Sequence, residues 1–364
     1  MKDLNQDGQK RDTYKKWMWS LVSLLLAILT IRMVMRQSKA VSVSQIAETV
    51  RHCHKGWLLL AIVAAGLYVW LEGTAIRAAL HAAGYRRGLF QGLLYSTADI
   101  YFSAVTPSAM GGQPASAYFM IRDDVPGGVA AAALVLNLVM YTLAIVVLGV
   151  LALVIHPTAF LDFNRFSRVL VLAGFLVLGV LTVLFIMVLK KGDRFFRRAK
   201  RLTSFLYHRK LIKNVKKTLL KLGRAERDYK NCIVLIEKQP GTMLRIFIWA
   251  FLQRTAQILV PVFLYLSFGG RGNRAVMLFC KQCLITIGYN FVPIPGAMGV
   301  SDYLMLDGFK KIVEHNMAYR LELFARCITF YCCVSVSGVI TLIGYLAGRK
   351  KEPETICERN CRIE

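Results

Sequence analysis

Two copies of one short phrase interrupt the apolar sequence of this chain, Pro107-Ser108-Ala109-Met110-Gly111 and Pro295-Gly296-Ala297-Met298-Gly299. A tyrosine lies six residues before each copy, Tyr101 and Tyr289. Paired hydrophobic segments that Gly and Pro break, in corresponding halves of a chain, are typical of the binding site of a repeat-built membrane transporter. The phrase therefore predicts both an architecture and the place of a site.

The sequence around the two copies reads as a series of membrane spans. Of 364 residues, 56% are hydrophobic, and near-continuous apolar stretches cover residues 17–31, 57–71, 129–155, 168–189, 242–268 and 321–347. A helix needs about 20 apolar residues to cross a bilayer core, and several stretches exceed that length. Because lipid-exposed backbone must be satisfied within helices or closed barrels, we expect an all-α polytopic integral membrane protein. The first stretch lacks a small-residue cleavage pattern, so we expect an uncleaved span.

The net charge of +26 is concentrated in one segment. Residues 190–230 hold 16 Lys and Arg against three acidic residues. A basic loop of this kind indicates the cytoplasmic side of a membrane protein, and no aromatic-interleaved nucleic-acid module surrounds it. Apolar residues recur in it close to a helical period, so we expect an amphipathic helix that lies on anionic lipid.

This basic loop sets the predicted topology. If it is cytoplasmic, the segment 89–120 starts and ends inside, and the segment 275–320 starts and ends outside. Each carries Pro and Gly at its middle, so we expect two re-entrant hairpins that enter from opposite faces, as in an inverted repeat. The predicted division is a first membrane half at 1–189, a basic amphipathic segment at 190–235, a second half at 236–348 and a tail at 349–364, with both termini cytoplasmic.

Ionisable residues within apolar segments are candidates for a site, because each costs roughly 2.5–3.5 kcal/mol at the bilayer centre. Glu72, Asp99, Arg254 and Arg326 are of this kind, although Glu72 and Arg326 also lie close enough to span ends to pair locally, Glu72 with Arg77, or to reach the interface. Arginine forks bind phosphate and carboxylates attract ammonium groups, so together they suit a zwitterionic or cationic lipid headgroup. Residues at or beside the broken turns complete the predicted substrate-binding set: Thr106, Pro107, Ser108, Gly111, Gly112, Gln113, Asn290, Pro295, Gly296, Gly299, Ser301 and Asp302.

No metal, cofactor or disulfide framework is expected. The nine cysteines have no framework spacing, and Cys280-x-x-Cys283 has neither a second such pair nor neighbouring histidines. The chain also lacks a P-loop, so ATP is not expected to supply energy within it.

The stretch Thr106–Tyr118 resembles the TPSxxGGQPxxAY signature of the lysylphosphatidylglycerol synthase transmembrane (flippase-like) family. The stretch Val292–Ser301 is similar to that family's second signature, PxPGGxGxxE, with Ala297 at a position that is often Gly and Asp302 near the usual acid. The resemblance covers roughly residues 15–347 and implies a bacterial inner-membrane protein similar to the lipid-translocating half of multiple peptide resistance factor.

The resemblance implies a flippase for phosphatidylglycerol or lysylphosphatidylglycerol that contributes to cationic peptide resistance. Two alternatives remain open at this point, a membrane component of lipid aminoacylation and a non-transporting scaffold. Because the sequence ends 16 residues after the last span, we expect no aminoacyltransferase domain in this chain. The expected partners are anionic phospholipids, a separate aminoacyl-lipid synthase and a second copy of the chain, and no direct binding of nucleic acid is expected.

Overall fold

The computed structural model describes residues 51, 53–106, 110–190, 197, 201, 215–237, 239–292, 297 and 299–348. Within these ranges the chain forms helices and no strand. The first half contains α3 (Lys55–Ala82), α4 (Leu89–Val105), α5 (Gly112–Arg122), α6 (Gly127–Ile155), α7 (Thr158–Leu161) and α8 (Arg165–Lys190). The remainder contains α10 (Val215–Glu237), α11 (Pro240–Ser267), α12 (Gly272–Asn290), α13 (Val300–Phe309), α14 (His315–Arg326), the π-helical turn η3 (Cys327–Cys332) and α15 (Cys333–Gly348).

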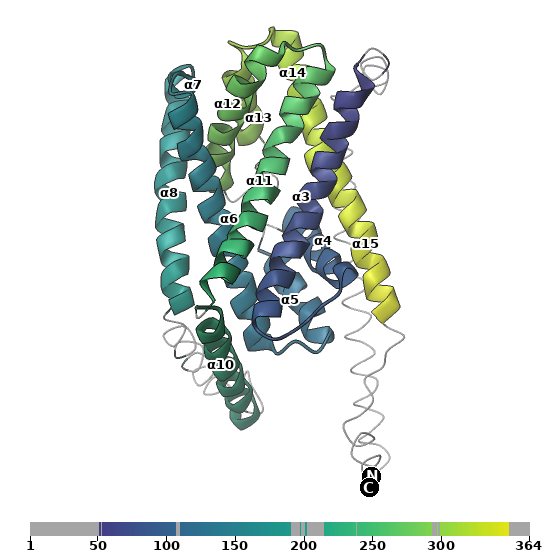
Figure 1. Ribbon diagram of the computed structural model, residues 1–364, viewed down its shortest axis with the longest axis vertical. Helices are drawn as coiled ribbons and strands as arrows, with labels where there is room; N and C mark the ends of the chain where they lie inside the picture. The colour runs from purple at the N-terminus through teal and green to yellow at the C-terminus, as the bar shows by residue number, and fades with distance from the viewer. Residues whose placement is uncertain are drawn as a thin grey trace.

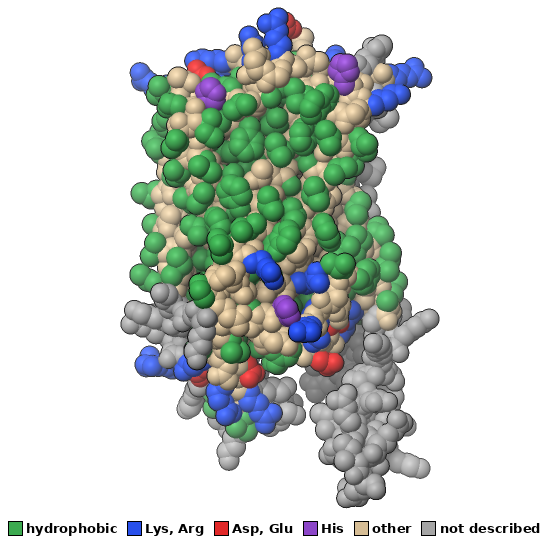
Figure 2. Space-filling model, in the orientation of Figure 1, with side chains coloured by type: hydrophobic (Ala, Val, Ile, Leu, Met, Phe, Trp, Pro, Cys, Tyr) green, Lys and Arg blue, Asp and Glu red, His purple; other side chains and the backbone are tan. Residues whose placement is uncertain are grey.

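Five helical segments in the described part are long and apolar enough to cross a membrane: Lys55–Ala82, Gly127–Ile155, Arg165–Leu189, Pro240–Ser267 and Asn316–Ala347. They confirm five of the predicted spans, and the first predicted span, 17–31, lies outside the described residues. Figure 2 shows apolar side chains across the middle of the molecule and most Lys and Arg toward its two ends. The protein is therefore an all-α polytopic membrane protein.

The spans run along the long axis of the molecule (Figure 1). Helix α3 packs along α11, and α6 packs against α8, α11 and α12. The start of α3 meets the end of α11, where His54 donates its backbone N–H to the Ser267 carbonyl at 2.8 Å. The two helices are thus antiparallel, and they join the first half of the chain to the second. We call the end of the molecule that carries α10 the α10 end, and the opposite one the α7 end.

Each predicted re-entrant segment forms a pair of short helices that pack on each other, α4 with α5 and α12 with α13. The α4–α5 pair lies toward the α10 end and the α12–α13 pair toward the α7 end (Figure 1). The turn residues 107–109, 293–296 and 298 lie outside the described residues. The second pair ends at Phe309 and the last span begins at Asn316, so this segment is shorter than the predicted 275–320. The inverted repeat itself stays a prediction.

Helix α10 differs from the prediction of a helix that lies on lipid. Tyr229, Cys232, Ile233 and Ile236 are buried in a core cluster that also contains residues of α3, α6 and α11. This part of the apolar face therefore packs on protein. The spacing of apolar residues predicted the helix and its apolar face, but it could not show that other helices cover that face.

Hydrogen bonds and ion pairs hold the α4–α5 pair at the α10 end of the molecule and the α12–α13 pair at the α7 end. At the α10 end, Asp123, between α5 and α6, accepts hydrogen bonds on Oδ2 from Tyr95 Oη at 2.7 Å and from Gln91 Nε2 at 3.1 Å. Its backbone carbonyl accepts a bond from Arg87 Nη2 at 2.6 Å. These contacts tie the loop after α5 to the start of α4.

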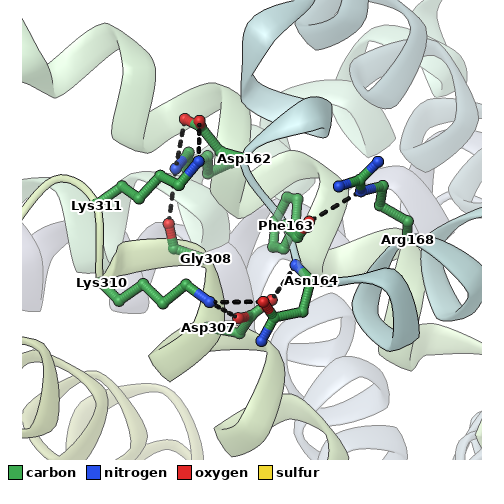
Figure 3. A network of polar contacts seen from close by, with 9 residues as sticks. Asp162, Phe163, Asn164, Arg168, Asp307, Gly308, Lys310 and Lys311 are labelled. Atoms are coloured by element: carbon green, nitrogen blue, oxygen red, sulfur yellow. Dashed lines mark hydrogen bonds and ion pairs between the residues drawn. The ribbon is translucent and has the colours of Figure 1, made fainter.

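At the α7 end, a lysine-rich network ties α12 and α13 to the loop between α7 and α8 (Figure 3). Lys281 is 0% exposed, and its Nζ lies 3.0 Å from Asp162 Oδ2 and donates to the Gly308 carbonyl at 2.9 Å. Lys311 Nζ lies 3.0 Å from Asp162 Oδ1. Lys310, Asp307 and Asn164 form a second group beside it. Lys281 was not among the interior charges predicted from the sequence.

Close approach of α3 and α4 gives a first prediction. A Cβ on Gly73 would lie 2.5 Å from the carbonyl oxygen of Gly92, so Gly73→Ala forces the helices apart and is expected to cost about 1–3 kcal/mol. Thermal unfolding of the detergent-solubilised protein measures this loss. On the same helix, a Cβ on Gly66 would meet no described atom within 4 Å, and Gly66→Ala should be neutral or stabilising by up to about 1 kcal/mol. Equal midpoints for the two variants would contradict the tight packing.

The Asp162 network gives a prediction with a defined pH dependence. Burial raises the pKa of Asp162, but hydrogen bonds and charges from Lys311 and Lys281 outweigh it and hold the pKa below the usual aspartate range. A lowered carboxyl pKa stabilises the fold above the ordinary value of about 3.9, and this contribution is lost as the pH falls through the folded-state value. Asp162→Asn should therefore cost about 1.5–3 kcal/mol at neutral pH, and the difference from the wild type should shrink below about pH 4.

Thermal unfolding between neutral pH and about pH 3 tests this dependence. Glu314→Gln, at an exposed position before α14, is the matched control and should change the midpoint little, because this side chain is exposed and does not cap the helix. A midpoint difference for Asp162→Asn that stays constant across the pH range would show that the carboxylate charge is not what stabilises the network.

Candidate functional site

A cavity of about 470 Å³ lies between the two halves of the molecule. Residues from α3, α4, α5, α6, α8, α11, α12, α13, α14, η3 and α15 line it. Seven of the predicted site residues are among them: Glu72, Asp99, Gln113, Arg254, Asn290, Ser301 and Arg326. All four ionisable residues that the sequence analysis singled out therefore meet at one cavity.

Glu72 of α3 and Asp99 of α4 form a carboxyl pair at the wall of this cavity. The two side chains lie close enough to affect each other electrostatically, and each residue is only 7% exposed. Two buried carboxylates side by side repel each other, because neither charge is solvated by bulk water. The arrangement therefore favours one shared proton and one negative charge.

Neutral donors from other helices hold the pair in place. Gln253 Nε2 of α11 donates to Glu72 Oε2 at 3.2 Å. Ser103 Oγ donates to Asp99 Oδ1 at 3.2 Å, and Gln113 Nε2 of α5 donates to Asp99 Oδ2 at 3.1 Å. A Cβ on Gly112 would collide with the Asp99 carboxylate, so only glycine lets the start of α5 approach this closely. The α4–α5 pair therefore places Asp99 against Glu72.

The expected local pair between Glu72 and Arg77 is not formed. Arg77 Nε instead donates to the Arg87 carbonyl at 3.0 Å, at the turn before α4. Helix α11 packs along α3 and brings Gln253 to Glu72, which removes the need for a partner on the same helix.

Arg254 of α11 is a buried cation without a carboxylate partner among the described residues. It is 5% exposed, and its Nη1 donates to Gln257 Oε1 at 2.5 Å. Its guanidinium carbon lies 3.7 Å from the ring centre of Tyr141 and 5.4 Å from that of Tyr68. Its Nε has no hydrogen-bond partner in the described part of the chain. Aromatic faces stabilise a cation only in part, so this guanidinium retains the capacity to bind an anion.

Arg326 lines the same cavity but is already neutralised. Its Nη2 contacts Asp302 Oδ1 and donates to Ser301 Oγ at 2.5 Å, and its Nε lies 3.3 Å from Glu322 Oε1. Two carboxylates therefore compensate this guanidinium. Asp302 Oδ2 also accepts the Gly299 N–H at 2.9 Å, which closes the start of α13. Arg326 fixes α13 against α14, whereas Arg254 is free to take a ligand.

Five of the predicted residues do not line the cavity: Thr106, Gly111, Gly112, Gly299 and Asp302. Thr106 ends α4, since its hydroxyl donates to the Phe102 carbonyl at 2.6 Å and accepts the Gly111 N–H at 2.9 Å. These residues shape the two helix pairs around the site. Pro107, Ser108, Pro295 and Gly296 lie outside the described residues.

Several lining residues were missed from sequence. They are polar or aromatic side chains that surround the charged groups: Tyr68, Ser103, Asn137, Tyr141, Thr142, Gln257, Gln282, Thr286 and Tyr289. Tyr141 Oη donates to Asn290 Oδ1 at 2.9 Å and so joins α6 to α12 across the halves. Helical spacing gave a usable signal for Tyr68 and Gln257, which lie one turn from Glu72 and Arg254. Asn137 stands alone as an amide in the apolar helix α6.

The unequal pairing of the two arginines gives a prediction about stability. Arg254→Gln should leave the folding stability within about 1 kcal/mol of the wild type, because it removes a buried charge that lacks a carboxylate partner among the described residues. Arg326→Gln should cost about 3–5 kcal/mol, because it leaves Asp302 and Glu322 without their cation. Thermal unfolding in detergent without added lipid compares the two. A larger loss for Arg254→Gln than for Arg326→Gln would reverse the assignment of the two roles.

Comparison with known proteins places this architecture. Residues 18–337 match the family model described as the lysylphosphatidylglycerol synthase TM region. The chain is also 22% identical over 257 residues to the UPF0104 membrane protein PH1989 of Pyrococcus horikoshii, which covers 67% of this chain and 73% of that protein. The family match spans most of the chain, including both short-helix pairs and all the cavity-lining residues. The chain therefore belongs to the lysylphosphatidylglycerol synthase transmembrane-region family.

Proposed function

We propose that the protein translocates phospholipids of the phosphatidylglycerol or lysylphosphatidylglycerol type across the bacterial inner membrane, with the headgroup passing through the cavity. The observation that carries the proposal is Arg254, a buried guanidinium whose Nε has no partner among the described residues, on the wall of a cavity inside a membrane protein. A lipid phosphate supplies the missing anion, and an arginine fork is suited to bind it.

The negative charge of the carboxyl pair, opposite in sign to that of Arg254, supports a headgroup that carries both a phosphate and an ammonium group. Glu72 and Asp99 line the cavity with Arg254, so one wall attracts a phosphate and another attracts an ammonium group. The volume of about 470 Å³ lies within the usual range of ligand pockets, about 300–1,000 Å³. Apolar side chains that include Ile100, Leu181 and Phe185 also line it, which suits the glycerol and upper acyl groups of a lipid.

The distribution of basic residues indicates how the protein is oriented in the membrane. The basic segment around α10 favours the α10 end as the cytoplasmic side by the positive-inside rule. In this orientation the α4–α5 pair faces the cytoplasm and the α12–α13 pair faces the exterior. Moving an aminoacylated lipid outward makes the outer surface less negative, and this change would contribute to cationic peptide resistance.

A second candidate function is a membrane component of lipid aminoacylation that acts with a separate synthase. The family description favours it, because it names a synthase of lysylphosphatidylglycerol. In that case the cavity presents phosphatidylglycerol to the partner enzyme. The same phosphate site would serve both functions, and the difference lies in whether lipid crosses the bilayer without the partner.

Reconstituted liposomes test translocation. Acyl-labelled fluorescent phosphatidylglycerol is placed in both leaflets and bleached from outside with dithionite. The wild-type protein should expose the inner-leaflet lipid, whereas protein-free liposomes should keep it protected. Arg254→Gln should slow this exposure about 10- to 100-fold, because a charge-assisted contact to phosphate contributes about 1.5–3 kcal/mol. Arg254→Lys, which keeps the charge without the fork, should fall between them.

Gly66→Ala is the matched control and should translocate lipid at the wild-type rate, since no described atom lies near the added methyl group. Protection of the inner leaflet by wild-type protein would contradict translocation. If protection persists while the protein increases lysyl transfer by an added synthase, the second candidate function stands instead.

A further inference from the structure

The charges on the cavity wall follow a simple balance. Arg254 contributes one positive charge, and the neighbouring buried carboxyls of Glu72 and Asp99 on the same cavity contribute one negative charge when they share a single proton. Arg326 and its two carboxylates form a separate cluster on α13 and α14. The charges of Arg254 and of the carboxyl pair therefore balance each other when the pair holds one proton.

We propose that the Glu72–Asp99 pair exchanges protons with the bound headgroup, so that the total charge in the cavity stays constant. This inference rests on the proposed function. A headgroup with one net positive charge displaces the shared proton to water, and both carboxylates are then ionised beside it. A zwitterionic headgroup leaves the proton in place. A headgroup with one net negative charge brings a second proton onto the pair.

The pair is suited to this role because its surroundings do not titrate in the same range. The titratable or charged groups next to the pair are Arg254 of α11 and Tyr68 of α3, and around these two lie Tyr141, Tyr289 and Cys333 of α6, α12 and α15. Tyrosine, arginine and cysteine ordinarily titrate at about 8.5 or above. The donors Gln253, Gln113 and Ser103 are neutral. Among these groups, the two carboxyls are therefore the ones that exchange protons near neutral pH. The carboxyls of Asp302 and Glu322 pair instead with Arg326.

Burial makes this exchange necessary for charged cargo. The pair is 7% exposed at each residue, so a change in charge is not screened by bulk water. Proton exchange keeps the summed charge of Arg254, the pair and the headgroup at zero in every loaded state. Over a transport cycle, a cationic headgroup that leaves on one side is replaced by a proton, so one cation and one proton move in opposite directions. The membrane potential then does not oppose export of a cationic lipid, and the proton gradient drives it.

Isothermal titration calorimetry in two buffers of different ionisation enthalpy counts these protons, because the difference in heat reports the number released. The probes are dihexanoyl lipids with three headgroups: phosphoglycerol, phosphoethanolamine and lysine-esterified phosphoglycerol, whose net charges at about pH 6 are about −1, 0 and +1. The expected proton counts for the wild-type protein are one taken up, none, and one released. Equal counts for all three probes would overturn the inference and leave the proposed function intact.

Variants of the two carboxyls test whether the exchanged proton comes from the Glu72–Asp99 pair. Glu72→Gln leaves one carboxyl, which stays ionised beside Arg254, so the cationic probe should release no proton while the zwitterionic probe still binds. Asp99→Asn should give the same result and replaces Glu72→Gln if that variant does not fold. Glu322→Gln is the matched control, because Glu322 is equally buried at 7% but pairs with Arg326, and it should keep the release of one proton.

The outcomes separate the two proposals. Release that is lost in Glu322→Gln and kept in Glu72→Gln would place the proton elsewhere and overturn the inference alone. If none of the three probes binds the wild-type protein, the proposed function and the inference fail together. Binding of all three probes that Arg254→Gln leaves unchanged would contradict the phosphate site of the proposed function, whatever the proton count.

Discussion

A charge buried within a membrane protein needs compensation, and the structure depends on how each buried charge obtains it. Lys281 has Asp162 and a backbone carbonyl, and Arg326 has Asp302 and Glu322. Both sets connect short helices to their neighbours, so compensation and packing are achieved by the same contacts. Arg254 is different because aromatic rings and one amide are its main contacts. A fold that satisfies these other interior cations so completely leaves Arg254 open for a ligand.

The two short-helix pairs depend on the same principle at the backbone level. A chain that turns within the membrane region exposes N–H and C=O groups that lipid cannot satisfy. Thr106 supplies both a donor and an acceptor at the end of α4, and Asp302 accepts the N–H of Gly299 at the start of α13. These residues were predicted to bind substrate, but they satisfy the turns. The Thr106 hydroxyl bonds only to the backbone here, whereas Asp302 bonds both to the backbone and to Arg326, and neither residue lines the cavity.

The sequence was informative wherever a residue conflicted with its local surroundings. Glu72, Asp99, Arg254 and Arg326 stood out because each is ionisable within an apolar run, and all four line the cavity. Lys281 was not predicted as an interior charge, although it is fully buried. Partners were harder to predict. Gln253 lies 181 residues from Glu72, and only the packing of α11 on α3 brings them together. The spacing of residues along the chain does not predict such a contact.

The repeated phrase thus has an indirect relation to the site. Gly112 lets α5 approach Asp99 so closely that no larger residue fits, and Gln113, which follows it, donates to that carboxylate. The corresponding part of the second copy sets Asp302 and Ser301 against Arg326. One copy therefore supports an acidic group and the other neutralises a basic one. The two helix pairs thus differ in the charged groups that they support. The carboxyl pair and Arg254, which carry opposite charges, remain together on the wall of a single cavity.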